Sequence, residues 1–139
     1  MITTAIVMDT SFLVATYLPT DRHHGIAVKW LAEHYVAHDL ITPSLARCEF
    51  ASALARNGVS PTSIDEALGS LSHRFTMFDT TEDILRIATD IARDQKLRGC
   101  DSVFVALALQ QRAPLVTFDV DQAKKGSLVI NVEFLPAIS

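Results

Sequence analysis

The sequence contains few of the residues that mark unusual protein classes. It has two cysteines, five glycines and five prolines among 139 residues, and neither glycine nor proline is concentrated in a tract. This distribution offers no candidate for a disordered tail or linker. Because 49% of the residues are apolar, the chain can cover a core without disulfides or a structural metal. We therefore expect one domain over residues 1–139.

Long apolar runs and an excess of positive charge are also missing. The first apolar run ends at Asp9 and has no basic segment before it, which argues against a signal peptide or a membrane span. Cys48 and Cys100 are then expected to be reduced thiols, and a cytoplasmic location is the default expectation. The net charge of −4 argues against binding nucleic acid by overall charge, but it permits a nuclease with local basic residues.

Hydrophobic periodicity predicts strands that alternate with helices. Short apolar runs typical of buried strands occur at residues 5–8, 40–42, 75–78, 115–118 and 128–132. Helical spacing indicates helices at residues 25–36, 45–57, 64–71, 82–97 and 101–111. Ser44, Ser60 and Thr80 or Thr81 are expected to cap helices, and Gly58 and Gly99 to end them.

This alternation predicts an α/β fold, a three-layer α/β/α sandwich around a mainly parallel sheet. Ligands of such sheets bind beyond the carboxyl ends of the strands. Asp9 follows the first expected strand, and Asp119 follows the strand at 115–118. Two carboxylates at one rim of the sheet are the first indication of function. A nucleotide-binding enzyme has little support, because no glycine-rich phosphate loop follows an expected strand.

Each aspartate at this rim also has a structural explanation. Asp9 and Asp119 can each cap the helix that follows, and Gln122 stands three residues after Asp119, at the spacing of a capping box. Asp101 can either cap its own helix or point into a cleft. For these three residues, the sequence leaves both interpretations open.

Glu49 differs from these aspartates, because it lies on a helical stripe of small or apolar residues. An unpaired carboxylate buried there would be costly. Ser52, Arg47 or Arg56 could compensate its charge, so a structural role for Glu49 also stays open.

Taken together, the four acidic residues indicate a metal site. Two carboxylates about 5 Å apart repel each other by roughly 3 kcal/mol at an effective dielectric constant near 20. Either their pKa values rise or a divalent cation occupies the cluster. Oxygen ligands favour Mg²⁺ or Mn²⁺, and such a cation can bind phosphate oxygens and activate water. This chemistry is typical of phosphodiester hydrolysis.

Four stretches in a specific order also carry a resemblance to a known family, and the resemblance covers essentially the whole chain. They are IVMDTSFLV at 6–14, ARCEFASALAR at 46–56, RGCDSVFVALALQQRAPLVTFD at 98–119, and DQAKK at 121–125. Together they resemble a PIN-domain ribonuclease, closest to the VapC toxins of bacterial and archaeal toxin–antitoxin pairs.

The resemblance implies a metal-dependent endoribonuclease that hydrolyses RNA to 5′-phosphate and 3′-hydroxyl ends. Its acidic residues carry over as Asp9, Glu49, Asp101 and Asp119, which would surround Mg²⁺ or Mn²⁺. Asp121 is a further candidate ligand. Two hydroxyl side chains would orient the carboxylates, and these are Ser11 and Thr117.

The resemblance also implies a homodimer and a cognate antitoxin whose C-terminal segment blocks the acidic cleft with a basic side chain. Five basic residues flank the acidic motifs and are candidate RNA contacts or ordinary solvated charges: Arg47, Arg56, Arg98, Lys124 and Lys125. Two alternatives remain: a housekeeping RNA-processing nuclease without an antitoxin, and a binding module that keeps the fold but does not cleave.

Overall fold

The protein forms a five-stranded sheet with helices on both faces, as described for residues 4–135 by a computed structural model. The strands are β1 (Thr4–Met8), β2 (His38–Pro43), β3 (Thr76–Phe78), β4 (Leu115–Thr117) and β5 (Val132–Phe134). The helices are α1 (Thr10–Tyr17), α2 (His24–His34), α3 (Ala46–Arg56), α4 (Pro61–Arg74), α5 (Glu82–Gln95), α6 (Gly99–Gln111) and α7 (Val120–Gly126). Among residues 4–135, no helix is long and apolar enough to cross a bilayer.

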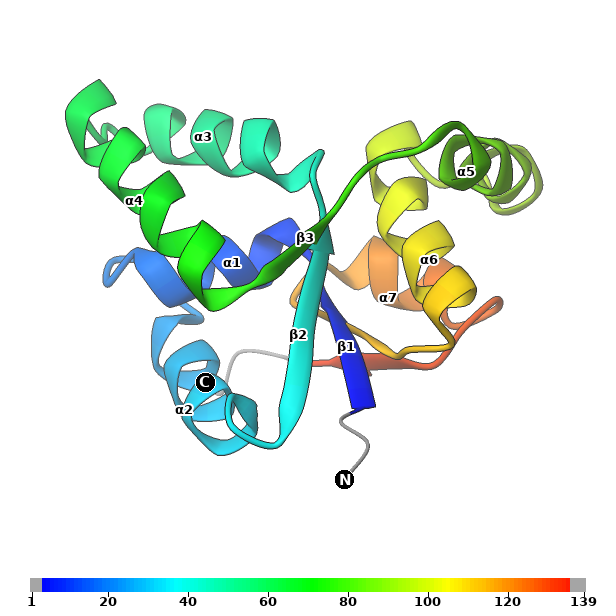
Figure 1. The fold of residues 1–139 in the computed structure, drawn as a ribbon, viewed down its shortest axis with the longest axis horizontal. Helices are drawn as coiled ribbons and strands as arrows, with labels where there is room; N and C mark the ends of the chain where they lie inside the picture. Colours follow the sequence, from blue (N-terminus) through cyan, green and yellow to red (C-terminus); the bar gives the residue numbers. More distant parts are fainter. Residues whose placement is uncertain (1–3, 136–139) are drawn as a thin grey trace.

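The strands lie in the order β3-β2-β1-β4-β5, and all neighbouring strands are parallel. From β1 the chain moves outward through β2 to β3, and then returns to place β4 on the other side of β1 (Figure 1). This reversal creates a switch point between β1 and β4, where open α/β sheets bind ligands. The register pairs Val7 with Leu115 and Met8 with Val116, so both strands end at the same rim.

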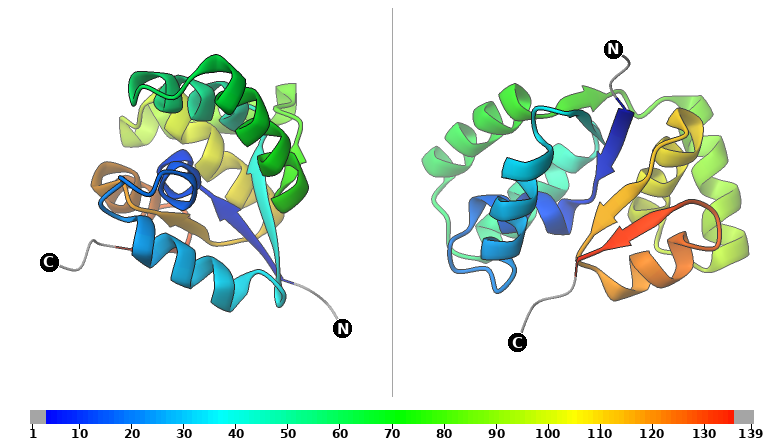
Figure 2. Two further views of the ribbon diagram at one scale, coloured as in Figure 1. Left: turned by 90° about the vertical axis from the view of Figure 1, so that its left-hand side faces the viewer. Right: turned by 90° about the horizontal axis from the view of Figure 1, so that it is seen from below.

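The helices cover the two faces of the sheet in chain order. Helices α1–α4 lie on one face and α5–α7 on the other (Figures 1 and 2). Right-handed crossovers explain this division, because the first two connections move across the sheet in one direction and the third moves back. The predicted three-layer α/β/α sandwich with a parallel sheet is confirmed.

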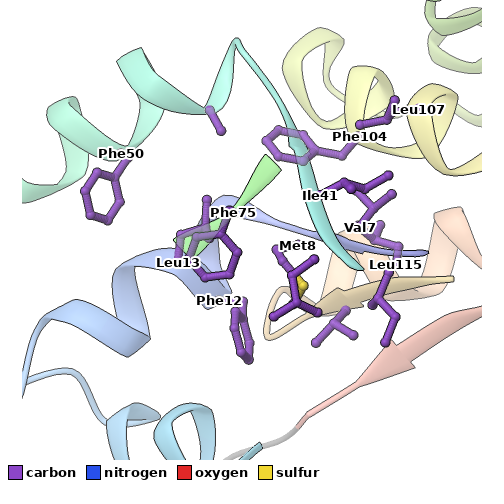
Figure 3. Close-up of a cluster of buried hydrophobic side chains, with 14 of the residues drawn as sticks. Val7, Met8, Phe12, Leu13, Ile41, Phe50, Phe75, Phe104, Leu107 and Leu115 are labelled. Carbon is purple, nitrogen blue, oxygen red and sulfur yellow. The ribbon is translucent and has the colours of Figure 1, made fainter. Parts of the chain in front are cut away.

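The core packs against both faces of β1. Val7 and Met8 are fully buried, as expected for a central parallel strand. Phe12 of α1 packs edge-to-face on Trp30 of α2, with ring centroids 5.2 Å apart, and α6 buries Phe104 against the opposite face (Figure 3). This packing fixes the position of β1 and therefore of the residue that follows it.

Most expected elements are present with small shifts at their ends. The hydroxyl of Ser60 caps α4 by accepting from the backbone N–H of Ser63 at 3.2 Å. The hydroxyl of Thr81 caps α5 in the same way, through Ile84 at 3.2 Å. Gly58 has a φ of +81° just after α3, a conformation that favours glycine at a helix end. These local signals are confirmed.

The expectation that Ser44 caps α3 is wrong. Its hydroxyl accepts from the backbone N–H of Thr80 at 3.1 Å. The hydroxyl of Thr80 in turn accepts from the backbone N–H of Leu45 at 3.3 Å. No side chain caps α3, whose N-cap residue is Leu45. Ser44 and Thr80 instead join the two segments that follow β2 and β3, a contact that a local sequence pattern does not reveal.

Two predicted boundaries also change. Helix α5 ends at Gln95, because Lys96 takes the left-handed conformation with a φ of 55°, and Gly99 begins α6 instead of ending α5. The last strand is β5, at Val132–Phe134, whereas most of the expected segment 128–132 forms a turn and bend. The apolar residues of this turn have the composition of a buried strand, which explains the wrong prediction.

Replacing Ser60 by alanine should lower the free energy of unfolding by about 1 kcal/mol, because the first turn of α4 loses its capping acceptor. Urea denaturation measures this change. Ser72→Ala is the matched control, since the exposed hydroxyl of Ser72 only donates to the Leu68 carbonyl inside the same helix. Equal losses in both variants would contradict the capping role.

Candidate active site

Asp9 and Asp119 follow the two strands at the switch point. Asp9 comes directly after β1, and its backbone N–H donates to the Val116 carbonyl at 3.1 Å. Its Oδ1 accepts from the backbone N–H of Thr10 at 2.8 Å, and Oδ1 of Asp119 accepts from that of Gln122 at 2.9 Å. Both aspartates therefore cap helices, but each uses one oxygen to do so. Capping and a functional role are compatible.

All four predicted acidic residues line one cavity of about 380 Å³. They come from the ends of β1 and β4, from α3, and from the first turn of α6. The residues that line the cavity are Asp9, Thr10, Ser11, Glu49, Arg98, Gly99, Cys100, Asp101 and Asp119. The structure thus brings together acids that are far apart in the chain.

Asp9 is the most deeply buried acid of this cavity, with 4% of its surface exposed. Burial raises its pKa to about 7, the hydrogen bond from Thr117 opposes this change, and the charge of Asp101 adds to it. The repulsion between carboxylates that the sequence predicts contributes to this change, but burial is its main cause.

Ser11 and Thr117 hold the carboxylate of Asp9 as a pair. Both hydroxyls donate to its Oδ2, that of Ser11 at 3.0 Å. Ser11 Oγ accepts from the backbone N–H of Phe118 at 3.0 Å, and Thr117 Oγ1 accepts from that of Asp119 at 2.9 Å. Because each hydroxyl already accepts a backbone hydrogen, its own hydrogen is free to point at Asp9. The two hydroxyls therefore orient the carboxylate of Asp9. The Thr117 hydroxyl binds the backbone N–H of Asp119 and not the carboxylate of that residue.

The guanidinium of Arg98 binds the carboxylates of both Asp101 and Asp119. Nε of Arg98 donates to Oδ2 of Asp101 at 2.8 Å, and Nη2 donates to Oδ2 of Asp119 at 3.1 Å. Arg98 occupies the N-cap position of α6 and no side chain caps that helix, so Asp101 is not a cap. Burial raises the pKa of Asp101, Arg98 opposes this change, and the charges of Asp119 and Glu49 add to it.

Glu49 reaches the cavity from α3, where it is partly buried. Its Oε1 accepts from the hydroxyl of Thr10 at 2.7 Å. The suggested partner Ser52 accepts from Arg56 at 2.7 Å. Thr10 is a site residue that the sequence did not reveal: it adjoins Asp9, but its partner lies 39 positions away.

Asp121 does not line the cavity. Its Oδ1 lies 3.1 Å from Nζ of Lys125 on the same helix. Lys125 also donates to the Lys96 carbonyl at 3.0 Å, which engages its ammonium group within the protein. Of the two acids in the motif that follows β4, Asp119 is the one that faces the cavity.

The remaining basic candidates differ in their distance from the acids. Arg98 contacts two of them directly. Arg56 lines an adjoining cavity of about 350 Å³ that Glu49 also lines. Arg47 and Lys124 are exposed. The positive charge closest to the acidic cluster is therefore that of Arg98.

Two further residues support the cavity from positions that the sequence did not single out for this role. Gln122 is fully buried, and its Nε2 donates to the Asp101 carbonyl at 3.1 Å, which ties α7 to the start of α6. A capping box would instead turn this side chain back on its own helix. Cys100 lines the cavity, and burial together with the charge of Glu49 raises the pKa of its thiol.

The donor set of the cavity fits a hard divalent cation, although Arg98 lies between two of the acids. Within residues 4–135, no three acidic, histidine or cysteine side chains already form a metal-binding group. All four acids nevertheless line the same cavity, and burial, which raises the pKa values of Asp9 and Asp101, removes their carboxylates from the water that would otherwise stabilise the charge. Oxygen ligands of this kind suit Mg²⁺ or Mn²⁺.

These features define a class: a parallel α/β protein with an acidic cavity at the switch point of its sheet. Within this class, the family model for the PIN domain matches residues 6–128. The chain belongs to the PIN-domain family. No curated protein matches the sequence.

Several solved structures, each less than 25% identical to this chain, have a similar fold. VapBC2 from Rickettsia felis, bound to a promoter DNA fragment, matches with a TM-score of 0.74 and 13% identity, over 95% of this chain and 99% of that chain. VapC20 from Mycobacterium tuberculosis, a toxin that cleaves the sarcin–ricin loop, matches with a TM-score of 0.73 and 22% identity, over 87% and 95%. FitAcB from Neisseria gonorrhoeae matches with a TM-score of 0.70 and 17% identity, over 94% and 97%.

Proposed function

We propose that the protein is a divalent-metal-dependent endoribonuclease and the toxin of a toxin–antitoxin pair in the cytoplasm. The observation that carries the proposal is the convergence of Asp9, Glu49, Asp101 and Asp119 on one cavity at the switch point. Membership of the PIN-domain family supports it. A non-cleaving module would not require four buried or partly buried acids around one space, because their burial costs free energy.

In this proposal Asp9, Asp101, Asp119 and Glu49 hold Mg²⁺ or Mn²⁺. The bound cation would supply positive charge that binds phosphate oxygens and lowers the pKa of a water nucleophile. Asp9 is kept in place by the hydroxyls of Ser11 and Thr117. Fixed carboxylates reduce the reorganisation needed when substrate binds.

RNA is the proposed substrate because the similar VapC20 cleaves the sarcin–ricin loop. The exposed Arg47 and Lys124, together with Arg56 beside the cavity, are proposed contacts for the RNA backbone. Lys125 is a weaker candidate, since its ammonium already binds Asp121 and the Lys96 carbonyl.

An antitoxin partner and a homodimer are part of the proposal. VapBC2 and a toxin–antitoxin complex from Klebsiella pneumoniae, which has a TM-score of 0.71 and 17% identity, support the partner. A basic side chain of the antitoxin would bind the carboxylates of the cavity as Arg98 does in this structure.

Incubation of the purified protein with labelled structured RNA tests the nuclease activity. We expect cleavage with Mg²⁺ or Mn²⁺, no cleavage with EDTA, and 5′-phosphate and 3′-hydroxyl ends on the fragments. DNA of the same sequence is the control for substrate class. A 2′,3′-cyclic phosphate end would contradict the proposal, because it would make the RNA's own 2′-hydroxyl the nucleophile instead of water.

Purification from the native host tests the toxin role. We expect a small protein to co-purify and to suppress RNA cleavage, and we expect expression of the chain alone to arrest growth. Expression of the Asp9→Asn variant is the matched control for non-specific burden. An active enzyme that the host tolerates alone would instead indicate a housekeeping RNA-processing nuclease.

Replacing Thr10 by valine should lower the rate constant of the cleavage step about tenfold, because Glu49 loses the hydroxyl that orients it. Thr10→Ser keeps a hydroxyl and should stay close to the wild type. Single-turnover cleavage measures both variants. If serine and valine reduced the rate equally, the hydrogen bond to Glu49 would not be the reason.

A further inference from the structure

Arg98 is the only basic residue among those that line the acidic cavity in residues 4–135. It lies in the short connection between α5 and α6, after the buried Leu97. Its guanidinium spans Asp101 and Asp119, with one nitrogen on each carboxylate at 2.8 and 3.1 Å. One side chain therefore joins acids from two different walls of the site.

The exposure of these side chains indicates that Arg98 is held by its charged end. The Arg98 side chain is 69% exposed, whereas those of Asp101 and Asp119 are 14% and 31% exposed. The partly buried carboxylates are fixed in the fold: Asp101 lies on the first turn of α6, and Asp119 caps α7. The exposed arginine has few packing contacts to lose. It can therefore leave the carboxylates at a small cost.

Arg98 contacts one oxygen of each of two carboxylates that are proposed to hold the metal. Oδ2 of Asp101 and Oδ2 of Asp119 both accept from the guanidinium, and Oδ1 of Asp119 is already used to cap α7. The remaining oxygen of Asp119, Oδ2, is the one that Arg98 binds. A divalent cation held by Asp119 would therefore compete with the guanidinium for this oxygen, and the two positive charges would repel each other.

We propose that Arg98 is an internal counter-ion that neutralises Asp101 and Asp119 in the metal-free protein and must swing away before a divalent cation binds. Arg98 thereby weakens the affinity of the site for the metal. This inference rests on the proposed metal-dependent function, and it adds that the chain carries its own competitor for the metal site.

Binding of Mn²⁺ to the full chain without RNA tests the proposal, because this measurement does not depend on cleavage. Isothermal titration at pH 7.5 would compare the wild type with Arg98→Gln. We expect the variant to bind Mn²⁺ about three- to tenfold more tightly, the range expected when exposed ion pairs no longer compete. The single ammonium of an Arg98→Lys variant cannot span both carboxylates as the guanidinium does, so we expect this variant to bind Mn²⁺ with intermediate affinity. It replaces Arg98→Gln in the comparison if the glutamine variant is unstable.

Arg86→Gln is the matched control. Arg86 is 73% exposed and lies 3.5 Å from Asp83 on α5, so its removal changes the net charge equally but leaves the cavity intact. We expect its Mn²⁺ affinity to stay within about twofold of the wild type, as for a distant screened charge.

Equal or weaker Mn²⁺ binding by Arg98→Gln, in a wild type that binds Mn²⁺ and cleaves RNA, would overturn the role of Arg98 alone. A similar gain in Arg86→Gln would also overturn it, since net charge would then be the cause. If neither the wild type nor Arg98→Gln bound Mn²⁺, the proposed metal-dependent function would fail, and this inference with it.

Discussion

Replacing Asp9 by asparagine should reduce RNA cleavage by about a thousandfold or more, the largest effect that we expect from a single substitution. A loss of this size corresponds to roughly 4 kcal/mol of transition-state stabilisation, as expected when a metal site loses a ligand. Asparagine keeps the shape of the side chain and can still accept from the backbone N–H of Thr10. It removes the charge, and its amide group faces the hydroxyls of Ser11 and Thr117 that donate to Oδ2.

Single-turnover cleavage at saturating Mg²⁺ measures this loss, and thermal melting confirms that the variant is folded. Asp65→Asn is the control for charge, because Asp65 is exposed on α4 and does not line the cavity. Asp119→Asn and Asp121→Asn form a second comparison, in which only the former should cause a large loss. An Asp9→Asn variant that kept a tenth of the wild-type rate would contradict the assignment of Asp9 as a metal ligand.

The stability of the metal-free protein should decrease as the pH rises from about 4 to above 7. The pKa of Asp9 is about 7 in the folded protein, against 3.8 as the ordinary value. The folded state therefore binds this proton more tightly than the unfolded state. Its contribution to stability is complete below pH 3.8 and is lost as the pH rises through 7. The raised pKa of Asp101 acts in the same direction.

Urea denaturation of the wild type and Asp9→Asn in EDTA isolates this effect, since other titrating groups are common to both. Between pH 5 and pH 8, the wild type should lose roughly 2–3 kcal/mol of stability relative to Asp9→Asn. Addition of Mg²⁺ at pH 8 should restore stability to the wild type alone, because a bound ligand stabilises the folded state. A constant difference between the two proteins would show that Asp9 does not titrate in this range.

Local sequence patterns predicted the elements well where the interactions are also local. Ser60 and Thr81 cap the helices in which they were expected, because a cap joins residues three positions apart. Ser44 does not cap α3, because its hydroxyl accepts from the backbone N–H of Thr80, a residue beyond the next strand. The Thr80 hydroxyl accepts from the backbone N–H of Leu45. The last strand was misplaced because the apolar residues of a turn share the composition of a strand.

The candidate site divides in the same way. The sequence alone determined that Asp9 and Asp119 follow buried strands and that Glu49 and Asp101 lie on helices, because hydrophobic periodicity and strand ends are short-range properties of the chain. Only the tertiary structure decided that the order β3-β2-β1-β4-β5 brings these acids to one cavity, that Thr10 orients Glu49, and that Arg98 spans two carboxylates. These contacts depend on which strands become neighbours and on competition among side chains for the same partners, and neither is encoded in any single segment.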